Sequence, residues 1–519
     1  MKQVSLKILP KNIDNEPFIL ERLAKKLRWR KNEIEDWRIV KRSIDARGKQ
    51  PFFLLQIEVS KTKNIPVPAS ILPQLAETTD RQSVIIIGAG PAGYFAALEL
   101  IELGYRPIVF DRGKDVRARR RDLKAIQQDG IVHPNSNYCF GEGGAGTYSD
   151  GKLYTRSHKR GKISKALQLL VDHGAKSDIL IDAHPHIGSN KLPKIVANIR
   201  ESILKFGGAI HFNSLVTDLI LQKGKCQGVV VNAEKEYLAD AVILATGHSA
   251  RDIYSLLRKK GIRQEFKPFA LGVRIEHPQK LIDKIQYNQP EREENLPAAS
   301  YKLVCQVRER GVFSFCMCPG GLVVPAATAP GELVVNGMSM SRRDSAFANS
   351  GTVVAVEEKD LLPYRSEGIF AGLALQKAVE QAIFNFGDGS QKAPAQRLTD
   401  FVNKKVSSSL PSTSYIPGIY AAPMHDLLPA FVYEHLQKGV QEFGRKMRGY
   451  YTEEAVVIGT ESRTSSPIRI PRNKETYMHE DAVGLFPCGE GAGFAGGIIS
   501  AALDGQNVAK AVAKFLTRH

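Results

Sequence analysis

Three glycines at the spacing G-x-G-x-x-G, Gly88, Gly90 and Gly93, are the residues of this sequence whose types and spacing most clearly suit chemistry. An apolar run at 84–87 precedes them and a longer one at 92–103 follows, as expected for a strand, a tight turn and a helix. In this setting the first glycine permits the turn, the second lets the backbone approach a pyrophosphate, and the third lets helix and strand pack closely. The segment therefore predicts a dinucleotide site, although glycines at this spacing also occur in ordinary turns.

An acid follows the next apolar run. Asp111 comes directly after residues 107–110, where the ribose hydroxyls of a dinucleotide are commonly bound by a carboxylate. The helix expected from residue 92 would present free backbone N–H groups and the positive end of its dipole to the phosphates. Strand, turn, helix, strand and acid thus all occur in the order that such a site requires.

A second glycine-rich segment covers residues 137–156 and lacks a β-branched strand before it. We expect a loop whose backbone lies against a flat or anionic ligand. The residues expected to make this contact are Gly143, Gly144, Ala145 and Gly146. The alternative is a flexible surface loop.

Cys316 and Cys318 form a C-x-C pair in an expected strand. A regular strand would place both thiols on one face, at the edge of disulfide reach. They could be a redox dithiol, a substrate-binding thiol, half of a metal site or two buried small residues. No second cysteine pair or nearby histidine cluster accompanies them, so we predict no metal site.

Other candidates for chemistry are single residues. His248 could act as an acid or base near a cofactor, or could be a satisfied turn histidine. Four arginines could clamp a carboxylate or phosphate with two hydrogen bonds, although most single arginines are surface residues: Arg342, Arg343, Arg463 and Arg469, of which we favour Arg463.

Composition restricts the class of protein. A chain of 519 residues with 43% hydrophobic and 24% charged residues is ordinary for a globular protein of two or three domains. No segment reads as a membrane span or a secretory signal, and six cysteines without a disulfide framework favour a cytoplasmic location. The net charge of +18 could serve nucleic acid, an anionic membrane surface, or an anionic cofactor and substrate. No zinc-finger, helix-turn-helix or RNA-recognition pattern is present, so nucleic acid is the less favoured partner.

The elements that must position these residues suggest four units. Residues 1–80 read as a ferredoxin-like β-α-β-β lobe followed by a linker. Residues 81–265 and 455–519 read as two parts of one α/β domain, and residues 266–454 as an inserted α+β domain. Within the insert we expect strands at 270–276, 301–307, 312–316, 322–325 and 333–338, and helices at 368–386, 395–406 and 427–449.

Taken together, these segments resemble the FAD-dependent oxidoreductases of the glutathione-reductase-like flavoprotein class. More narrowly, the motifs at 43–47, 140–153, 315–321, 336–339 and 463–467 resemble bacterial NAD(FAD)-utilising dehydrogenases of unassigned substrate. The resemblance implies an FAD-binding Rossmann-like, three-layer domain with an inserted substrate domain. It implies FAD contacts from Gly88, Gly90, Pro91, Ala92, Gly93, Asp111, Arg112, Arg119, Gly143, Gly144, Ala145, Gly146, Ser149, Val216, Ala245, Thr246, Gly247, Gly489, Glu490, Gly496, Gly497 and Ile498.

The resemblance also implies a function. We expect an FAD-dependent dehydrogenase that exchanges hydride at flavin N5 with a small, anionic organic substrate. The C-x-x-x-x-C pair of the disulfide reductases and a second nicotinamide-binding motif are missing from the sequence, so NAD(P)H in another pocket or a partner reductase would supply electrons. The alternatives are a flavoprotein associated with nucleic acid, as in tRNA modification, and a redox sensor that uses Cys316 and Cys318.

Overall fold

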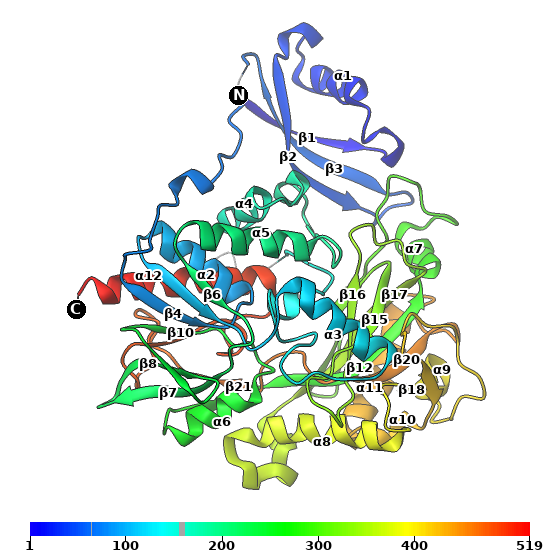
Figure 1. The fold of residues 1–519 in the computed structure, drawn as a ribbon. Helices are drawn as coiled ribbons and strands as arrows, with labels where there is room; N and C mark the ends of the chain where they lie inside the picture. Colours follow the sequence, from blue (N-terminus) through cyan, green and yellow to red (C-terminus); the bar gives the residue numbers. More distant parts are fainter. Residues whose placement is uncertain (64, 155–160, 519) are drawn as a thin grey trace.

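The computed structural model describes residues 1–63, 65–154 and 161–518 (Figure 1). Asn64 of the predicted linker and residues 155–156 of the glycine-rich segment lie outside the described residues. Among the described residues, no helix is both long and apolar enough to cross a membrane.

The N-terminal residues form a small sheet covered by one helix. In the first strand Val4, Leu6 and Ile8 are buried and alternate with exposed residues, so one face of this strand is covered. The sheet is antiparallel, in the order β1-β3-β2, and stands at the top of Figure 1. Its elements are β1 (Lys2–Ile8), α1 (Glu16–Leu27), β2 (Asp36–Asp45) and β3 (Phe52–Ser60).

A five-stranded parallel sheet lies at the centre of the dinucleotide-type domain, in the order β22-β10-β4-β5-β6. Its strands are β4 (Ser83–Ile87), β5 (Arg106–Phe110), β6 (Ala209–His211), β10 (Val242–Leu244) and β22 (Leu485–Pro487). Its helices are α2 (Pro91–Glu102), α3 (Val116–Gln128), α4 (Ile163–Asp172), α5 (Leu192–Lys205), α6 (Arg251–Lys259) and α12 (Ile498–Leu516).

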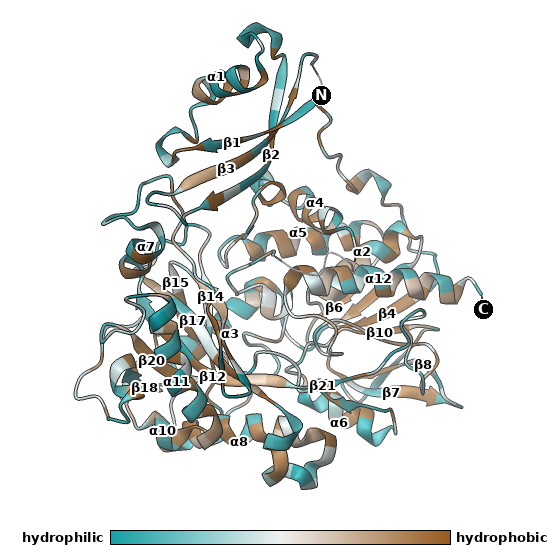
Figure 2. Cartoon of the chain, turned by 180° about the vertical axis from the view of Figure 1, so that it is seen from behind, coloured by the Kyte–Doolittle hydropathy of each residue, from teal (hydrophilic) through white to brown (hydrophobic). Residues whose placement is uncertain are grey.

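Both faces of this sheet are covered, which explains the uninterrupted apolar run of β4. Val84 and Ile86 pack against the layer of α2, α4, α5 and α12. Ile85 and Ile87 point the other way, toward a three-stranded antiparallel sheet of β7 (Val216–Gln222), β8 (Lys225–Val231) and β9 (Lys235–Leu238). Strands buried on both faces are apolar at every position. The result is three layers, with the apolar strands inside and polar helix faces outside (Figure 2).

A seven-stranded mixed sheet occupies the middle of the chain, in the order β13-β14-β17-β12-β20-β18-β19. Its strands are β12 (Phe269–Pro278), β13 (Val304–Val307), β14 (Arg310–Cys318), β17 (Phe347–Val356), β18 (Ala393–Arg397), β19 (Ile419–Ala421) and β20 (Val456–Glu461). The hairpin β15 (Gly321–Pro325) and β16 (Val335–Ser339) and the short pair β11 (Glu265–Phe266) and β21 (Ile468–Arg469) complete the strands. The helices are α7 (Gln279–Tyr287), η7 (Glu358–Phe370), α8 (Ala371–Phe386), α9 (Leu398–Val402), α10 (Met424–Leu427) and α11 (Ala430–Lys446).

Two expectations for this region are wrong. The sequence predicts that the chain re-enters the first domain at residue 455. The chain is still in the mixed sheet there, because β20 pairs with β12 and β18 in the interior of that sheet. The helix predicted over 395–406 is mostly not helical: β18 occupies its start, and only the five residues of α9 form a helix. Pairing with β20 and β19 outweighs the local preference of this segment.

Candidate active site

The turn between β4 and α2 shows why glycine is required at two of its positions. Gly88 has φ +107°, and a Cβ there would lie 2.4 Å from the carbonyl oxygen of Ala245. A Cβ on Gly93 would lie 1.9 Å from the carbonyl oxygen of Gly88. These two glycines serve the close approach of backbone to backbone. Gly90 differs, because the nearest atom to a Cβ there is 3.9 Å away and the residue lines a pocket.

Two helices begin at this pocket without a side-chain cap. Gly90 is the N-cap of α2 and Gly497 is the N-cap of α12, and neither helix has an acid in its first turn. A Cβ on Gly496 or Gly497 would meet nothing within 4 Å. Uncapped N–H groups and the positive ends of two helix dipoles thus face open space, which favours an anionic ligand.

One end of the pocket lies at the end of β5. Asp111 is buried, and its carboxylate accepts hydrogen bonds from the backbone N–H groups of Ala89 (2.9 Å) and Gly113 (2.8 Å). Each oxygen keeps a lone pair for a hydroxyl group of a ligand. Arg112 beside it pairs with Asp252, and its guanidinium carbon lies 4.6 Å from the ring centre of Phe140.

The glycine-rich loop is held from behind by Arg119, which sequence reasoning wrongly placed on the cofactor. Its fully buried guanidinium donates to the carbonyl oxygens of Asn137 (2.8 Å), Glu142 (2.8 Å) and Gly144 (3.0 Å). This side chain does not line the pocket. It fixes the loop instead, whose residues 144–146 form a short 3₁₀ turn along the pocket wall.

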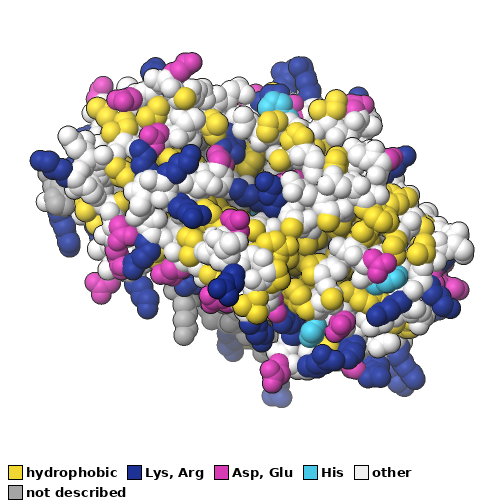
Figure 3. Space-filling model, turned by 90° about the horizontal axis from the view of Figure 1, so that it is seen from below, with side chains coloured by type: hydrophobic (Ala, Val, Ile, Leu, Met, Phe, Trp, Pro, Cys, Tyr) yellow, Lys and Arg dark blue, Asp and Glu magenta, His cyan; other side chains and the backbone are white. Residues whose placement is uncertain are grey.

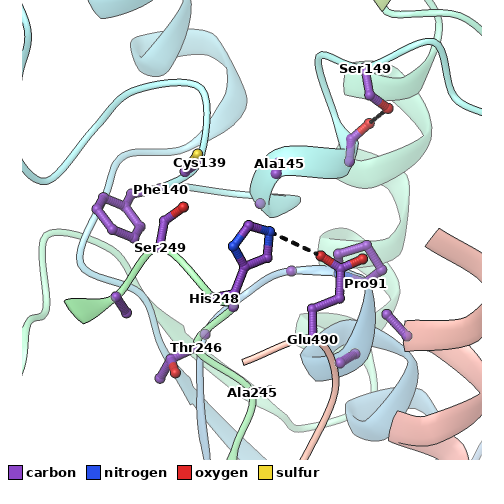
Figure 4. A pocket seen from close by; sticks show the side chains of 18 of the residues that line it. Pro91, Cys139, Phe140, Ala145, Ser149, Ala245, Thr246, His248, Ser249 and Glu490 are labelled. Carbon is purple, nitrogen blue, oxygen red and sulfur yellow. Dashed lines mark hydrogen bonds and ion pairs between the residues drawn. The ribbon is translucent and has the colours of Figure 1, made fainter. Parts of the chain in front are cut away.

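His248 and Glu490 face one another across the pocket, at a distance of 3.7 Å between Nε2 and Oε2 (Figure 4). Burial lowers the pKa of His248, and the nearby Glu490 carboxylate opposes this shift. The backbone N–H of Gly497 also donates to Glu490, which ties the carboxylate to the start of α12. A largely neutral histidine can either donate or accept one hydrogen bond toward a ligand.

Arg463 lines the pocket, but most of its N–H groups donate to protein acceptors. Nε and Nη2 donate to Glu380 (3.1 and 3.0 Å), Nη2 also donates to Glu332 (2.8 Å), and Nη1 donates to Thr328. Arg251 of α6 pairs with the same two glutamates. Four of the five N–H groups of this guanidinium are thus engaged by protein acceptors, which leaves too few for a bidentate clamp on a substrate.

Arg342 is also placed differently from the expectation. It is exposed and does not line the pocket. Its neighbour Arg343, another candidate for the substrate clamp, pairs instead with the buried carboxylate of Asp150.

Cys316 and Cys318 both line the pocket, but not as a regular strand would place them. Strand β14 has a bulge between Phe315 and Cys318, and Cys316 has φ +43°. Cys316 is exposed, whereas Cys318 is buried and its thiol donates to the carbonyl oxygen of Cys316 at 3.2 Å. A β-bulge beside a pocket commonly redirects a side chain, and here it points the two thiols into different surroundings.

Most of the predicted residues thus border one continuous pocket. Those that do are Gly88, Gly90, Pro91, Ala92, Asp111, Arg112, Gly144, Ala145, Gly146, Ser149, Val216, Ala245, Thr246, Gly247, His248, Cys316, Cys318, Arg463, Glu490, Gly496, Gly497 and Ile498. Those that do not are Gly93, Arg119, Gly143, Gly489 and Arg342. Sequence reasoning missed Asp150, Lys152 and Asn336, although all three lie within the motifs at 140–153 and 336–339. Within the described residues, no group of three or more His, Cys, Asp and Glu side chains could hold a metal ion.

Comparison with protein families gives three matches along the chain. The family described as "FAD-dependent protein, C-terminal domain-like" matches residues 268–464, which includes β20 with the mixed sheet. The family "Pyridine nucleotide-disulphide oxidoreductase" matches residues 82–262. A domain of unknown function matches residues 1–60.

Two curated proteins are similar in sequence. An "Uncharacterized protein" of Clostridium beijerinckii is 41% identical over 521 residues, which cover 96% of each chain. The thiamine thiazole synthase of Thermotoga maritima is 26% identical over 192 residues, 34% of this chain and 62% of that protein.

Two of the solved structures that align with this chain have TM-scores below 0.5. The flavin-dependent brominase Bmp2 aligns with a TM-score of 0.38 at 13% identity, over 85% of this chain and 80% of that chain. A geranylgeranyl bacteriochlorophyll reductase-like protein of Thermoplasma acidophilum aligns with a TM-score of 0.35 at 13% identity, over 84% and 79%. Similarity at this level says nothing about the substrate.

Proposed function

We propose that this chain is an oxidoreductase that acts on an anionic organic substrate. It belongs to the same family as the Clostridium beijerinckii protein, and it is an FAD-dependent flavoprotein. The observation that carries the proposal is the single pocket that joins Asp111, the uncapped starts of α2 and α12, and the two cysteines of the mixed sheet. One end of this pocket has the features of a nucleotide-binding site, and the other end is lined by two cysteine thiols.

The residues present fit FAD. Three of the lining residues are glycines, Gly90, Gly496 and Gly497. Because they have no side chain, they leave space for a cofactor where a Cβ would project into the pocket. In the proposed arrangement the turn 88–93 and the start of α2 would hold the pyrophosphate, Asp111 would bind the ribose, and the start of α12 would hold the flavin end of the cofactor. When bound, FAD supplies hydride exchange at its N5 atom.

The chain's own residues would then orient the substrate and control protons. His248, whose pKa is lowered by burial, is suited to exchange a proton at its ring nitrogen with a ligand group near neutral pH. Gly496 and Gly497 leave the start of α12 uncovered, so that its dipole favours negative charge there. NADH, NADPH or a partner reductase is the proposed electron donor.

The finer architecture is part of the same proposal. We treat residues 1–80 as a ferredoxin-like lobe with its linker, and the mixed-sheet region from 266 as a substrate domain inserted into the FAD domain. Because β20 belongs to the mixed sheet, the insert would end between Glu461 and Ile468 instead of at residue 454.

Anaerobic reduction of the purified yellow protein tests this function. We expect NADH or NADPH to bleach the flavin absorbance; if both fail while dithionite succeeds, a partner reductase is the donor. Gly90→Leu should fill the groove and weaken FAD binding at least about tenfold, or ~1.4 kcal/mol, without unfolding the chain. Gly48→Leu, in the hairpin loop after β2, is the matched control. A wild-type protein that neither contains nor binds FAD would overturn the proposal.

A second candidate is a redox sensor, and the position of both thiols at the pocket favours it. In this case oxidation would join Cys316 and Cys318, and each thiol would lose one electron and one proton to a two-electron acceptor such as the flavin. Substituting both cysteines by serine without any change in flavin reduction or in ligand binding would argue against it.

The nucleic-acid alternative gains no comparable support. On the face shown in Figure 3, Lys and Arg side chains are dispersed among acidic and apolar ones instead of forming one basic stripe. Steep salt-dependent binding of tRNA would be needed to restore this alternative.

A further inference from the structure

Three positively charged side chains line the pocket among the described residues, and two of them are already neutralised. Arg112 pairs with Asp252, and Arg463 is enclosed by Glu332 and Glu380. The third is Lys152, which lies in the glycine-rich segment, close to Cys318.

Among the described residues, the ammonium group of Lys152 makes long contacts only. Its Nζ lies 3.6 Å from Asp150 and 3.8 Å from the sulfur of Cys318, and 37% of its side chain is exposed. An ammonium group carries three donors, and neither of these contacts has the length of a strong charge-assisted hydrogen bond. Donor capacity therefore remains for a ligand.

The nearby acid does not cancel this charge, because another residue already binds it. Asp150 accepts two hydrogen bonds from Arg343 and one from the hydroxyl of Ser339. Burial alone would raise the pKa of Asp150, but Lys152 and Arg343 lower it to about 2. The acid is thus ionised and shared by two cations, and the cluster of Asp150, Lys152 and Arg343 retains one positive charge. His186 adjoins this cluster and adds none, because burial lowers its pKa.

The backbone beside Lys152 is also held in an unusual conformation. Cys316 has a left-handed φ at the bulge, and the buried guanidinium of Arg274 donates to its carbonyl oxygen (3.4 Å) and to the side chain of Asn349 (2.7 Å). Arg274 is itself paired with the buried Glu461 at 2.8 Å. Strain of this kind persists where the surroundings fix it and is frequent at functional sites. It leaves the Cys316 thiol exposed at the pocket.

We propose that Lys152 is the specificity-determining residue of a subsite that binds a carboxylate group of the substrate next to the Cys316 thiol. This inference rests on the proposed function and assigns its anion recognition to Lys152 in place of the arginines expected from the sequence. A point-like ammonium charge suits a single carboxylate that is free to rotate.

Paired alkylating probes of different charge test the subsite in the yellow holoprotein. Iodoacetate carries a carboxylate and iodoacetamide does not; with either, a carbon–sulfur bond forms at Cys316, iodide leaves and the thiol proton goes to solvent. Burial raises the pKa of the Cys316 thiol to about 12, so both reactions are slow at pH 8.5 and are followed over long incubations by peptide mass spectrometry. The ratio of the two rates at Cys316 should be about tenfold higher in the wild type than in Lys152→Gln.

The controls separate charge from structure. Lys152→Arg should keep most of the preference for iodoacetate, and Lys438→Gln on the exposed side of α11 should leave the ratio unchanged. In the wild type, raising the salt concentration should lower the ratio, because screening weakens attraction at an open site. Equal ratios in wild type and Lys152→Gln, or resistance of Cys316 to both reagents, would overturn the proposal. Neither readout involves turnover, so this failure differs from a failure of flavin reduction.

Discussion

The function of a pocket arginine depends on how many carboxylates surround it, as Arg463 and Arg343 illustrate. Both guanidinium groups are taken up by buried acids, Arg463 by Glu332 and Glu380 and Arg343 by Asp150. Lys152, whose acid neighbour is already bound, keeps its charge available. Sequence spacing can suggest that an arginine is near a site, but only the partners decide whether it can bind substrate.

We therefore predict that Arg463 acts as a structural residue. In Arg463→Gln, two buried glutamates would lose a partner, and breaking a buried ion pair from one side typically costs about 3–5 kcal/mol. Urea unfolding followed by circular dichroism should show this loss. Arg342→Gln, at an exposed position, should change stability by less than about 0.5 kcal/mol. An Arg463 variant of wild-type stability with weakened substrate binding would instead restore the clamp.

The glycine turn is the part of the site that could be predicted from sequence, because its constraints lie within a few residues. Gly88, Gly93 and the strand and helix around them enforce one geometry locally. Arg119 could not be placed in this way. Its carbonyl partners belong to a loop some twenty residues later, and nothing in the spacing shows whether its side chain faces the ligand or the loop.

At the scale of elements, long-range pairing decided the cases that sequence reasoning missed. No strand is predicted over 347–356, a segment that contains Asn349, Ser350 and Gly351, residue types common in turns. In the structure they lie inside β17, where Asn349 accepts from Arg274 and Ser350 contacts the hydroxyl of Tyr301 at 2.9 Å. Polar residues can occupy a central strand when buried partners satisfy them.

The contact between α2 and α12 gives the prediction for this scale. A Cβ on Gly505 would lie 2.1 Å from the carbonyl oxygen of Ala92, so Gly505→Ala must push the two helices apart. Overpacking of this kind costs about 1–3 kcal/mol. Because both helix starts border the pocket, FAD binding should weaken as well.

Flavin content after purification and the urea midpoint measure these two effects. Lys514→Ala, at an exposed position of α12, is the matched control and should alter neither. If Gly505→Ala retains both stability and flavin, the spacing between α2 and α12 does not set the geometry of the site.

At the scale of the whole molecule, the mixed sheet and the parallel sheet are joined by charges and by backbone. Arg251 at the start of α6 reaches Glu380 of α8 and Glu332 of the middle region, while β11 and β21 pair where the chain passes between the two sheets. The pocket lies along this junction, with one end on β5 and the other on β14. Under the proposed function, the nucleotide would bind at the β5 end and the substrate at the β14 end.

Stability as a function of pH should report on a histidine buried in the mixed sheet. His277 is fully buried at the end of β12, and burial lowers its pKa to about 4. Its Nε2–H donates to the carbonyl oxygen of Tyr450 at 2.8 Å. Its Nδ1 has no hydrogen-bond partner among the described residues, so protonation would create a buried donor without an acceptor.

The direction of the pH effect follows from this pKa. As the pH falls below 6.5, His277 becomes protonated in the unfolded chain. In the folded chain it stays neutral until the pH reaches about 4. Stability is therefore complete above pH 6.5 and falls as the pH decreases, by about 2 kcal/mol at pH 5 for this residue. In His277→Gln an amide N–H can still donate to Tyr450, but the titrating group is gone. The urea midpoint of the variant should thus fall less than that of the wild type between pH 7 and pH 5. Because the other buried histidines are common to both proteins, equal decreases would show that His277 does not titrate in the way its burial requires.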